Sequence, residues 1–253
     1  MLAANVLDIA DAWWAHDFGC SRAALRPSAT AVQQHTGELR GVGGVYVLAI
    51  GAHPIVSFPP EVLGRFGERA RRWSRALVAD VAALRAELAP LQIEKVIGPA
   101  SIAYGTAETL DLAAAERARE LGMDDAPRVA RLRASCNAEE WEHGGSEFDQ
   151  VPSFGASDES GALCALAGYE IWNRSIAHIA IVSAPNSRGR GFGTAAVARA
   201  ARHALDAGLL PQYRTLTSNT PSAAIARRLG FAEYGFSVYL RLAKPSRRAQ
   251  DGR

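Results

Sequence analysis

The sequence has little lysine, few cysteines and no long apolar run. Of its 28 basic residues only Lys95 and Lys244 are lysine, which together with the abundant alanine indicates a GC-rich, bacterial genome. The three cysteines, Cys20, Cys136 and Cys164, lie far apart and show no metal-ligand spacing. They predict neither a disulfide framework nor a metal site, and they favour a reducing cytoplasm.

Targeting signals and large charges are also missing. No run of 18 apolar residues occurs, so we expect no membrane-spanning helix. The N-terminus lacks a basic region followed by a long apolar core, so we expect no signal peptide. A net charge of +2 over 253 residues calls for neither nucleic acid nor a membrane surface as a partner. Residues 1–125 carry a net charge of −3 and residues 126–253 a net charge of +5, so the second half suits an anionic ligand.

A glycine-rich turn between a predicted strand and a predicted helix is the central feature. The β-branched run Ile176–Val182 predicts a buried strand, and the alanine-rich stretch Thr194–Ala207 predicts a helix that ends at Gly208. Between them, Arg188–Gly193 contains three glycines. Backbone N–H groups of such a turn, together with the free N–H groups of the helix start, can bind one anion. The stretch therefore predicts a phosphate-binding turn.

Two common phosphate-binding motifs do not fit this turn. A P-loop requires Gly-Lys-Ser/Thr, and no lysine is present here. The dinucleotide fingerprint requires Gly-x-Gly-x-x-Gly, whereas the spacing is Gly-x-Gly-x-Gly and no acidic residue ends the following strand. An ordinary strand–helix connection, or contact of the Arg-Gly repeat with RNA, remains an alternative at this point.

The surrounding patterns predict alternating helices and strands. In the first half we expect a helix at Ala3–Phe18, strands at Gly43–Ile50, His53–Phe58, Glu94–Ile97 and Ile102–Tyr104, and helices at Glu61–Leu88, with a break near Trp73, and Thr106–Leu121. In the second half we expect strands at Arg128–Leu132, Ser153–Ala156, Gly161–Trp172, Tyr213–Thr217 and Phe231–Leu242, a helical turn at Asn137–Trp141 and a helix from Thr220 to Gly230. Turn residues at Asp124–Pro127 predict a domain boundary: an N-terminal α/β lobe at 1–125, a second domain at 126–243 and a disordered basic tail at 244–253.

Two motifs of the second half resemble those of one enzyme family. Arg188, Gly191 and Gly193 match the Arg/Gln-x-x-Gly-x-Gly/Ala coenzyme A loop of the GCN5-related N-acetyltransferase (GNAT) superfamily, and Ser218–Phe231 resembles its second coenzyme A motif. The resemblance extends over residues 128–242. It implies an α/β (α+β) fold with a mixed, mostly antiparallel sheet flanked by helices. The N-terminal lobe is compatible with a degenerate lobe of the same kind, expected to shape the acceptor site or an oligomer interface such as that of a homodimer.

The resemblance implies acetyl-CoA as cofactor and a set of residues that hold it. Backbone groups of Ile181, Val182 and Ser183 would pair with the pantetheine arm. The pyrophosphate would lie on the turn formed by Arg188, Gly189, Arg190, Gly191, Phe192, Gly193 and Thr194. Asn219 and Ser222 would lie near the pantetheine or its thioester end. The implied activity is direct transfer of an acetyl group to a primary amine of a small molecule or peptide.

The chain departs from the family pattern where proton transfer is expected. The usual tyrosine proton donor is replaced by Ala226, and the usual glutamate of the strand before the loop falls near Ala177. A coenzyme A-binding sensor or partner-binding module without turnover is therefore the alternative function. Residues of the appropriate chemistry are present elsewhere, because an amine must lose a proton and the thiolate must gain one. The candidates are Glu140, Glu142 and His143, with Glu139, in the segment expected to overhang the acceptor; His178 and Glu170 on strands; and Tyr234 as the acid.

Overall fold

The chain forms two compact units, each made of two stretches of sequence. The computed structural model describes residues 2–145, 148 and 150–243, without the side chain of His143. Within these limits, unit 1 comprises residues 2–10 and 102–234, and unit 2 comprises residues 11–101 and 235–243. No helix of the described residues is long and apolar enough to cross a membrane. The predicted tail at 244–253 lies outside the described residues.

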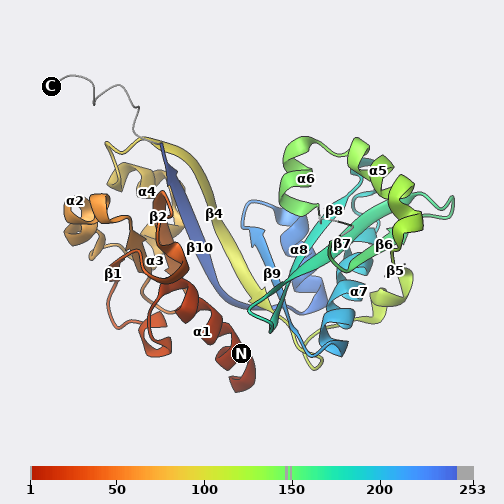
Figure 1. Ribbon diagram of the computed structural model, residues 1–253, viewed down its shortest axis with the longest axis horizontal. Helices are drawn as coiled ribbons and strands as arrows, with labels where there is room; N and C mark the ends of the chain where they lie inside the picture. The colour runs from red at the N-terminus through yellow and green to blue at the C-terminus, as the bar shows by residue number, and fades with distance from the viewer. Residues whose placement is uncertain (1, 146–147, 149, 244–253) are drawn as a thin grey trace. The chain divides into compact units, whose positions relative to one another are not determined.

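Unit 2 is a small sheet with helices on both faces (Figure 1). Val45 and Val47 face the cluster formed with residues 62–88, and Phe18 packs edge to face on Tyr46, which points to the opposite face. Its strands follow the order β1-β3-β2-β10-β4, with β1 parallel to β3, and β2 antiparallel to both β3 and β10. Val47, Phe58, Trp73 and Leu84 are among its fully buried core residues. Its elements are α1 (Ala4–Phe18, which begins in unit 1), η1 (Arg22–Leu25), β1 (Ala31–Gln34), η2 (Gly37–Leu39), β2 (Gly44–Ala49), β3 (Ile55–Phe58), α2 (Pro60–Ala70), α3 (Arg75–Ala79), α4 (Val81–Glu87), most of β4 (Ile93–Tyr104) and most of β10 (Ala232–Leu242).

Unit 1 is a sheet covered by helices on both faces (Figure 1). From the end of β4 its strands follow the order β9-β8-β7-β6-β5; neighbours from β5 to β8 are antiparallel, and β8 is parallel to β9. Its elements are η3 (Ala113–Arg117), β5 (Arg119–Glu120), η4 (Met123–Asp125), α5 (Ala126–Ser135), α6 (Ala138–Gly144), β6 (Ser153–Ser157), β7 (Leu163–Trp172), β8 (Ile176–Ser183), η5 (Pro185–Ser187), α7 (Phe192–Asp206), β9 (Leu210–Leu216) and α8 (Thr220–Leu229). The expected fold class, a mixed and mostly antiparallel sheet flanked by helices, is confirmed.

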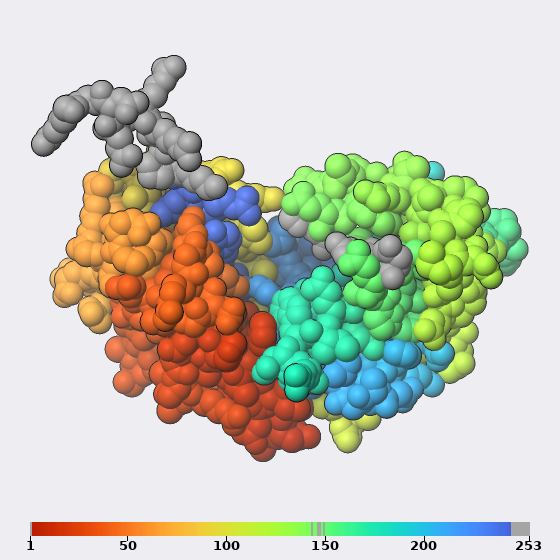
Figure 2. Space-filling model, viewed as in Figure 1, coloured from red at the N-terminus to blue at the C-terminus, as the bar shows by residue number. Residues whose placement is uncertain are grey.

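The two faces of the unit 1 sheet carry different helices. α7 presents a row of alanines and Val197 that are completely buried against β6, β7 and β8, because small side chains let a helix lie close to a sheet. On the opposite face α5 and α6 pack on Leu166 and Val182, and Figure 2 shows these two helices, in green, at the surface of the unit. The α7 face and the α5–α6 face are therefore distinct environments for side chains that alternate along β8.

Several predicted elements differ from the observed ones. Arg128–Leu132, expected as a strand, lies in α5, because Pro127 suits a first helical turn and Val129 and Leu132 are buried at a spacing of three. Thr106–Leu121, expected as one helix, is a turn followed by η3 and β5, and Leu110 is buried in the unit 1 core. Here tertiary packing overrides the local helical pattern.

Other differences concern breaks and the division into units. The expected helix Glu61–Leu88 is three helices, since Ser74 and Asp80 each cap a new start, and the two expected strands around Gly98-Pro99 form the single strand β4. The units do not divide at residue 125. The segment that follows residue 102 packs with α7, and the final strand β10 pairs with β2. Each unit is therefore built from two stretches that are far apart in the sequence.

Asp125 holds the start of α5 to β5. Its carboxylate accepts two hydrogen bonds from the Arg119 guanidinium, at 2.6 and 2.8 Å, and one from the Gly122 N–H at 3.1 Å, and the residue is only 6% exposed. The hydrogen bonds from Arg119 are the main cause that lowers the pKa of Asp125 to about 2.

We expect Asp125→Asn to lower the free energy of unfolding by about 2 kcal/mol at pH 7. Because the folded-state pKa is below the unfolded one, this contribution is complete above the unfolded pKa and disappears as the pH falls toward 2. Urea unfolding at pH 7 and pH 3 should therefore show a smaller difference at pH 3. Asp124→Asn, at an exposed neighbour, is the matched control and should change little. An equal loss at both pH values would contradict an ionic role.

Candidate functional site

The glycine turn connects the end of β8 to the start of α7, as predicted. Gly191 is the N-cap of α7 and has a φ of 87°, in the left-handed region that side chains with a Cβ rarely adopt. The helix starts at Phe192, and its first intrahelical bond comes from the Ala195 N–H to the Gly191 carbonyl. The N–H groups before Ala195 are left for a ligand or water, so the turn can bind an anion.

Gly193 brings α7 close to the end of β8. A Cβ at this position would lie 3.0 Å from Ser183 Oγ and 3.2 Å from Ile225 Cδ1, which is closer than a side chain normally packs. The glycine therefore allows the turn, the last residue of β8 and helix α8 to approach one another. These are the elements that carry most of the predicted cofactor residues.

Strands β8 and β9 are paired over only part of their length. Their parallel register runs from Ile176–Leu210 to Ile179–Tyr213, and among the described residues it goes no further. β8 continues to Ser183, paired with β7 alone, and β9 continues to Leu216. We call this point the fork. Beyond it, Ile181, Val182 and Ser183 belong to a strand edge that is no longer laddered to β9, where an extended ligand can bind backbone groups.

The second predicted cofactor motif lies at the start of α8. The Asn219 side chain caps this helix by accepting from the Ser222 N–H at 3.2 Å. The Ser222 hydroxyl lies 2.8 Å from the Tyr213 hydroxyl, and burial raises the pKa of Tyr213 to about 12. Ser222 thus has a protein partner already. Ala226 is buried in the unit 1 core at the position where a proton-donating tyrosine was expected.

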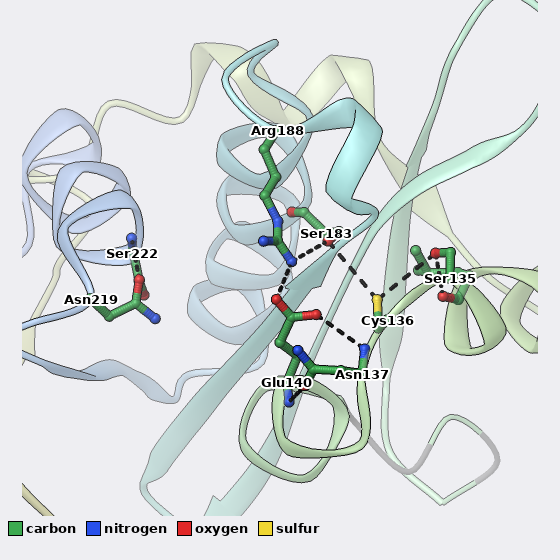
Figure 3. A network of polar contacts seen from close by, with 9 residues as sticks. Ser135, Cys136, Asn137, Glu140, Ser183, Arg188, Asn219 and Ser222 are labelled. Atoms are coloured by element: carbon green, nitrogen blue, oxygen red, sulfur yellow. Dashed lines mark hydrogen bonds and ion pairs between the residues drawn. The ribbon is translucent and has the colours of Figure 1, made fainter.

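Arg188 of the turn is bound to the opposite side of the site. Its guanidinium donates to the Glu140 carboxylate at 2.5 Å and lies 3.4 Å from the Ser183 carbonyl (Figure 3). Glu140 is also part of the N-terminal capping box of α6 with Asn137. The hydrogen bond from Arg188 lowers the pKa of Glu140, and the bond to the Asn137 backbone acts in the same direction. Glu140 is therefore a paired carboxylate, which is a weaker proton acceptor than the sequence led us to expect.

The other residues of the predicted acceptor segment lie around a surface hollow. Glu142 is exposed, and the side chain of His143 lies outside the described residues. The hollow has a volume of about 420 Å³. It is lined by Arg133, Cys136, Asn137, Ala138, Trp141 and Glu142. Cys136 Sγ lies 4.0 Å from the Ser183 carbonyl, so the hollow is next to the end of β8 (Figure 3).

A further arginine, which the sequence motif does not include, lies at the turn. Nη1 of Arg117, the last residue of η3, lies 3.3 Å from the point that a Cβ of Gly191 would occupy. Among the described residues Arg117 forms no ion pair. The carboxylate next to it in the sequence, that of Glu116, is bound to Arg202 at 3.1 Å. Arg190 lies over the Phe192 ring, with its guanidinium carbon 5.1 Å from the ring centroid. Only the packing of η3 on α7 reveals Arg117, because no sequence spacing links it to the turn.

The remaining candidates of the proton-transfer set are placed as follows. His178 lies on β8 one residue before the fork, with Nδ1 3.0 Å from the Gln212 Oε1 of β9. Glu170 is exposed on β7 and accepts from the Trp172 indole N–H at 3.2 Å. Tyr234 is 6% exposed and packs edge to face on Tyr104. The structure thus brings His178 to the fork, while the Glu170 carboxylate is bound by the hairpin tryptophan.

Comparison with known proteins finds one matching family and structures of similar fold. Residues 111–231 match the model of the Acetyltransferase (GNAT) family. A GNAT-family structure from Novosphingobium aromaticivorans has a TM-score of 0.50 at 19% identity, covering 62% of this chain and 69% of its own. A GCN5-related N-acetyltransferase from Kribbella flavida has a TM-score of 0.44 at 15% identity, covering 79% and 71% of the two chains. No curated protein has a significant sequence match. The similarity to the Novosphingobium aromaticivorans structure shows that the two chains share a fold.

The glycine at the N-cap of α7 provides a direct test of the turn. We expect Gly191→Val to abolish binding of coenzyme A, the ligand that the resemblance implies, because a branched Cβ strains the backbone and meets Arg117. Gly208→Val is the matched control: it has a φ of 72° beyond the other end of α7 and no atom within 4 Å of its Cβ position. Isothermal titration should show binding lost only in the first variant. Normal binding by Gly191→Val would mean that the turn does not hold the ligand.

Proposed function

Because residues 111–231 match the model of the Acetyltransferase (GNAT) family, we propose that this protein is an acetyl-CoA-dependent N-acetyltransferase that transfers acetyl directly to a primary amine. The observation that carries the proposal is the position of the glycine turn at the open end of the fork. One site offers N–H groups for a pyrophosphate and, next to them, a strand edge that is not paired with β9 and could bind a pantetheine arm. The family match supports acetyl-CoA as a ligand whose pyrophosphate and pantetheine arm suit these two features.

Different residues of this chain would bind the two parts of the cofactor. The N–H groups of the turn and Arg117 supply donors and positive charge for the pyrophosphate, and the strand edge at Ile181–Ser183 supplies backbone groups for the pantetheine. The bound group contributes an activated thioester. Arg188, which the motif assigns to the phosphate, is bound to Glu140 and links the turn to α6. α6 in turn lies on β8, with Gly144 against the Ile181 carbonyl.

The acceptor is a primary amine that reaches the fork from the α5–α6 face. The hollow beside Cys136 and Trp141 adjoins the end of β8 on this side. Its lining combines an aromatic ring with Glu142 and Arg133, so it suits an amine with a polar or charged body. The Glu140 carboxylate adds less negative charge to the acceptor side than the sequence predicts, because Arg188 is paired with it.

A second candidate function is binding of coenzyme A without turnover, as a sensor or partner-binding module. The observation that favours it is Ala226, buried where a proton donor is expected. The two functions share the cofactor site and differ in chemistry. Coenzyme A binding without transfer to any amine would support this second function.

Binding of coenzyme A is the first expected outcome. At a ligand concentration about 100 times Kd the free energy of unfolding should rise by roughly 2.7 kcal/mol. Thermal shift with coenzyme A measures this, and an assay of free thiol with acetyl-CoA and a panel of amines measures turnover. Spermidine, lysine, an aminoglycoside and a peptide with a free N-terminus cover the main acceptor classes. No stabilisation by coenzyme A would exclude both functions.

The free arginine beside the turn should matter more than the paired one. We expect Arg117→Ala to weaken coenzyme A binding about tenfold, through loss of a charge-assisted hydrogen bond. Arg188→Ala should weaken it less, because that guanidinium is bound to Glu140. Pantetheine, which lacks the pyrophosphate, is the control ligand and should bind all variants alike. An order of effects opposite to this one would assign the phosphate to Arg188.

A further inference from the structure

A chain of three polar side chains crosses the strands of unit 1 at the fork. His178 Nδ1 lies 3.0 Å from Gln212 Oε1, and Gln212 Nε2 donates to the Tyr104 hydroxyl at 2.7 Å. Gln212 and Tyr104 are both 0% exposed. A buried glutamine costs free energy unless both ends of its amide are bound, so a fully bonded one fixes the groups at either side.

This chain determines which ring nitrogen of His178 carries a proton. The Gln212 amide donates through Nε2 to Tyr104, so its Oε1 is left to accept. With the amide in this orientation, Nδ1 of His178 is the donor and Nε2 keeps its lone pair. The Trp172 ring lies parallel to the imidazole, with centroids 4.0 Å apart and planes at 16°, and this stacking restrains the ring plane.

His178 is on the face of the sheet from which the acceptor comes. Along β8, His178 and Val182 point to the same face because side chains alternate. Val182 is packed in the cluster that α5 and α6 cover. In register, His178 pairs with Gln212 one step before the last pair, Ile179–Tyr213. The histidine is thus at the closed end of the fork, and the glycine turn is at the open end.

We propose, on the basis of the acetyltransferase function above, that His178 accepts the proton of the acceptor amine, and that Gln212 and Tyr104 are positioning residues that keep its Nε2 unprotonated. The amine nitrogen forms a bond to the acetyl carbon, and the bond from that carbon to sulfur breaks. His178 takes the proton from nitrogen as that bond forms and then donates it to sulfur. The products are an amide and a thiol, with no net gain or loss of protons. These proton transfers need no tyrosine at position 226.

The surroundings of His178 favour a neutral imidazole. Burial and the charge of Arg214, which lies over Trp172 from β9, lower the pKa of His178 to about 4, and the hydrogen bond to Gln212 opposes them in part. From β7 the cross-strand neighbour Glu170 faces His178, and its carboxylate is bound to Trp172. The imidazole is therefore neutral above about pH 5. Its protonated form is a strong enough acid to protonate a thiolate, whose pKa is about 8.5 for a free thiol.

Nitrogen-15 NMR of the imidazole tests the arrangement without an acceptor. In the wild type we expect the His178 signals, assigned with His178→Asn, to show Nδ1 protonated and Nε2 bare at pH 7. Gln212→Glu should raise the His178 pKa, because a carboxylate stabilises the imidazolium, and Gln212→Leu should remove the tautomer preference. Tyr169→Phe is the control for Tyr104→Phe: it removes a buried hydroxyl that is bound to His203 on the α7 face, and should leave His178 unchanged. A proton on Nε2 in the wild type would overturn the proposal.

Kinetics with an amine from the panel test the chemistry. We expect His178→Ala to lower kcat by roughly 100-fold or more and Gln212→Leu by about tenfold, with the Kd of coenzyme A unchanged in both. Coenzyme A binding with wild-type turnover in His178→Ala would overturn this inference alone. Binding with no turnover of any amine by the wild type would also overturn it, while supporting the non-turnover function. Absence of coenzyme A binding would overturn both this inference and the proposed function.

Discussion

The partial pairing of β8 with β9 is the constraint on which the site depends. Parallel strands cannot be joined by a tight turn, so the chain must leave the carboxyl end of β8, cross the sheet as α7 and return as β9. This crossover places the start of α7 beside the end of β8. Because the register ends at Ile179 and Tyr213, the same crossover leaves a strand edge next to the helix start. Donors for an anion and donors for an extended chain therefore arise from one topological feature.

Packing around this feature explains the composition of its neighbours. Alanines on α7 let the helix lie close to the sheet, and Gly193 lets its first turn approach Ser183 and α8. On the other face, Arg188 holds α6 to the turn through Glu140, and the buried Gln212 lies within hydrogen-bond distance of the His178 ring. Electrostatic pairing and close packing thus fix groups that come from β8, β9 and α6.

The sequence predicted those parts of the site that depend on local chemistry. The glycine turn and the end of α8 at Gly230 are each specified by residues within a few positions of one another. Arg117, Gln212 and the partner of Arg188 were not predictable, because only the packing of distant segments brings them to the turn and the fork. The wrong prediction of a strand at Arg128–Leu132 has a related cause. A run this short fits both the repeat of a strand and the repeat of a helix, and only its packing in the folded chain distinguishes the two.

The last strand has a consequence for any shortened form of the chain. β10 begins in unit 1 and pairs with β2, which is nearly 200 residues earlier in the sequence, over the range Phe236–Arg241. A fragment that starts at residue 126 keeps the whole of β10 but loses β2, and with it the ladder partner of a strand containing the buried Val238 and Leu240. Unpaired apolar strand edges recruit other chains. A fragment of this kind is therefore not a self-contained module, because the pairing of its last strand depends on residues that precede it.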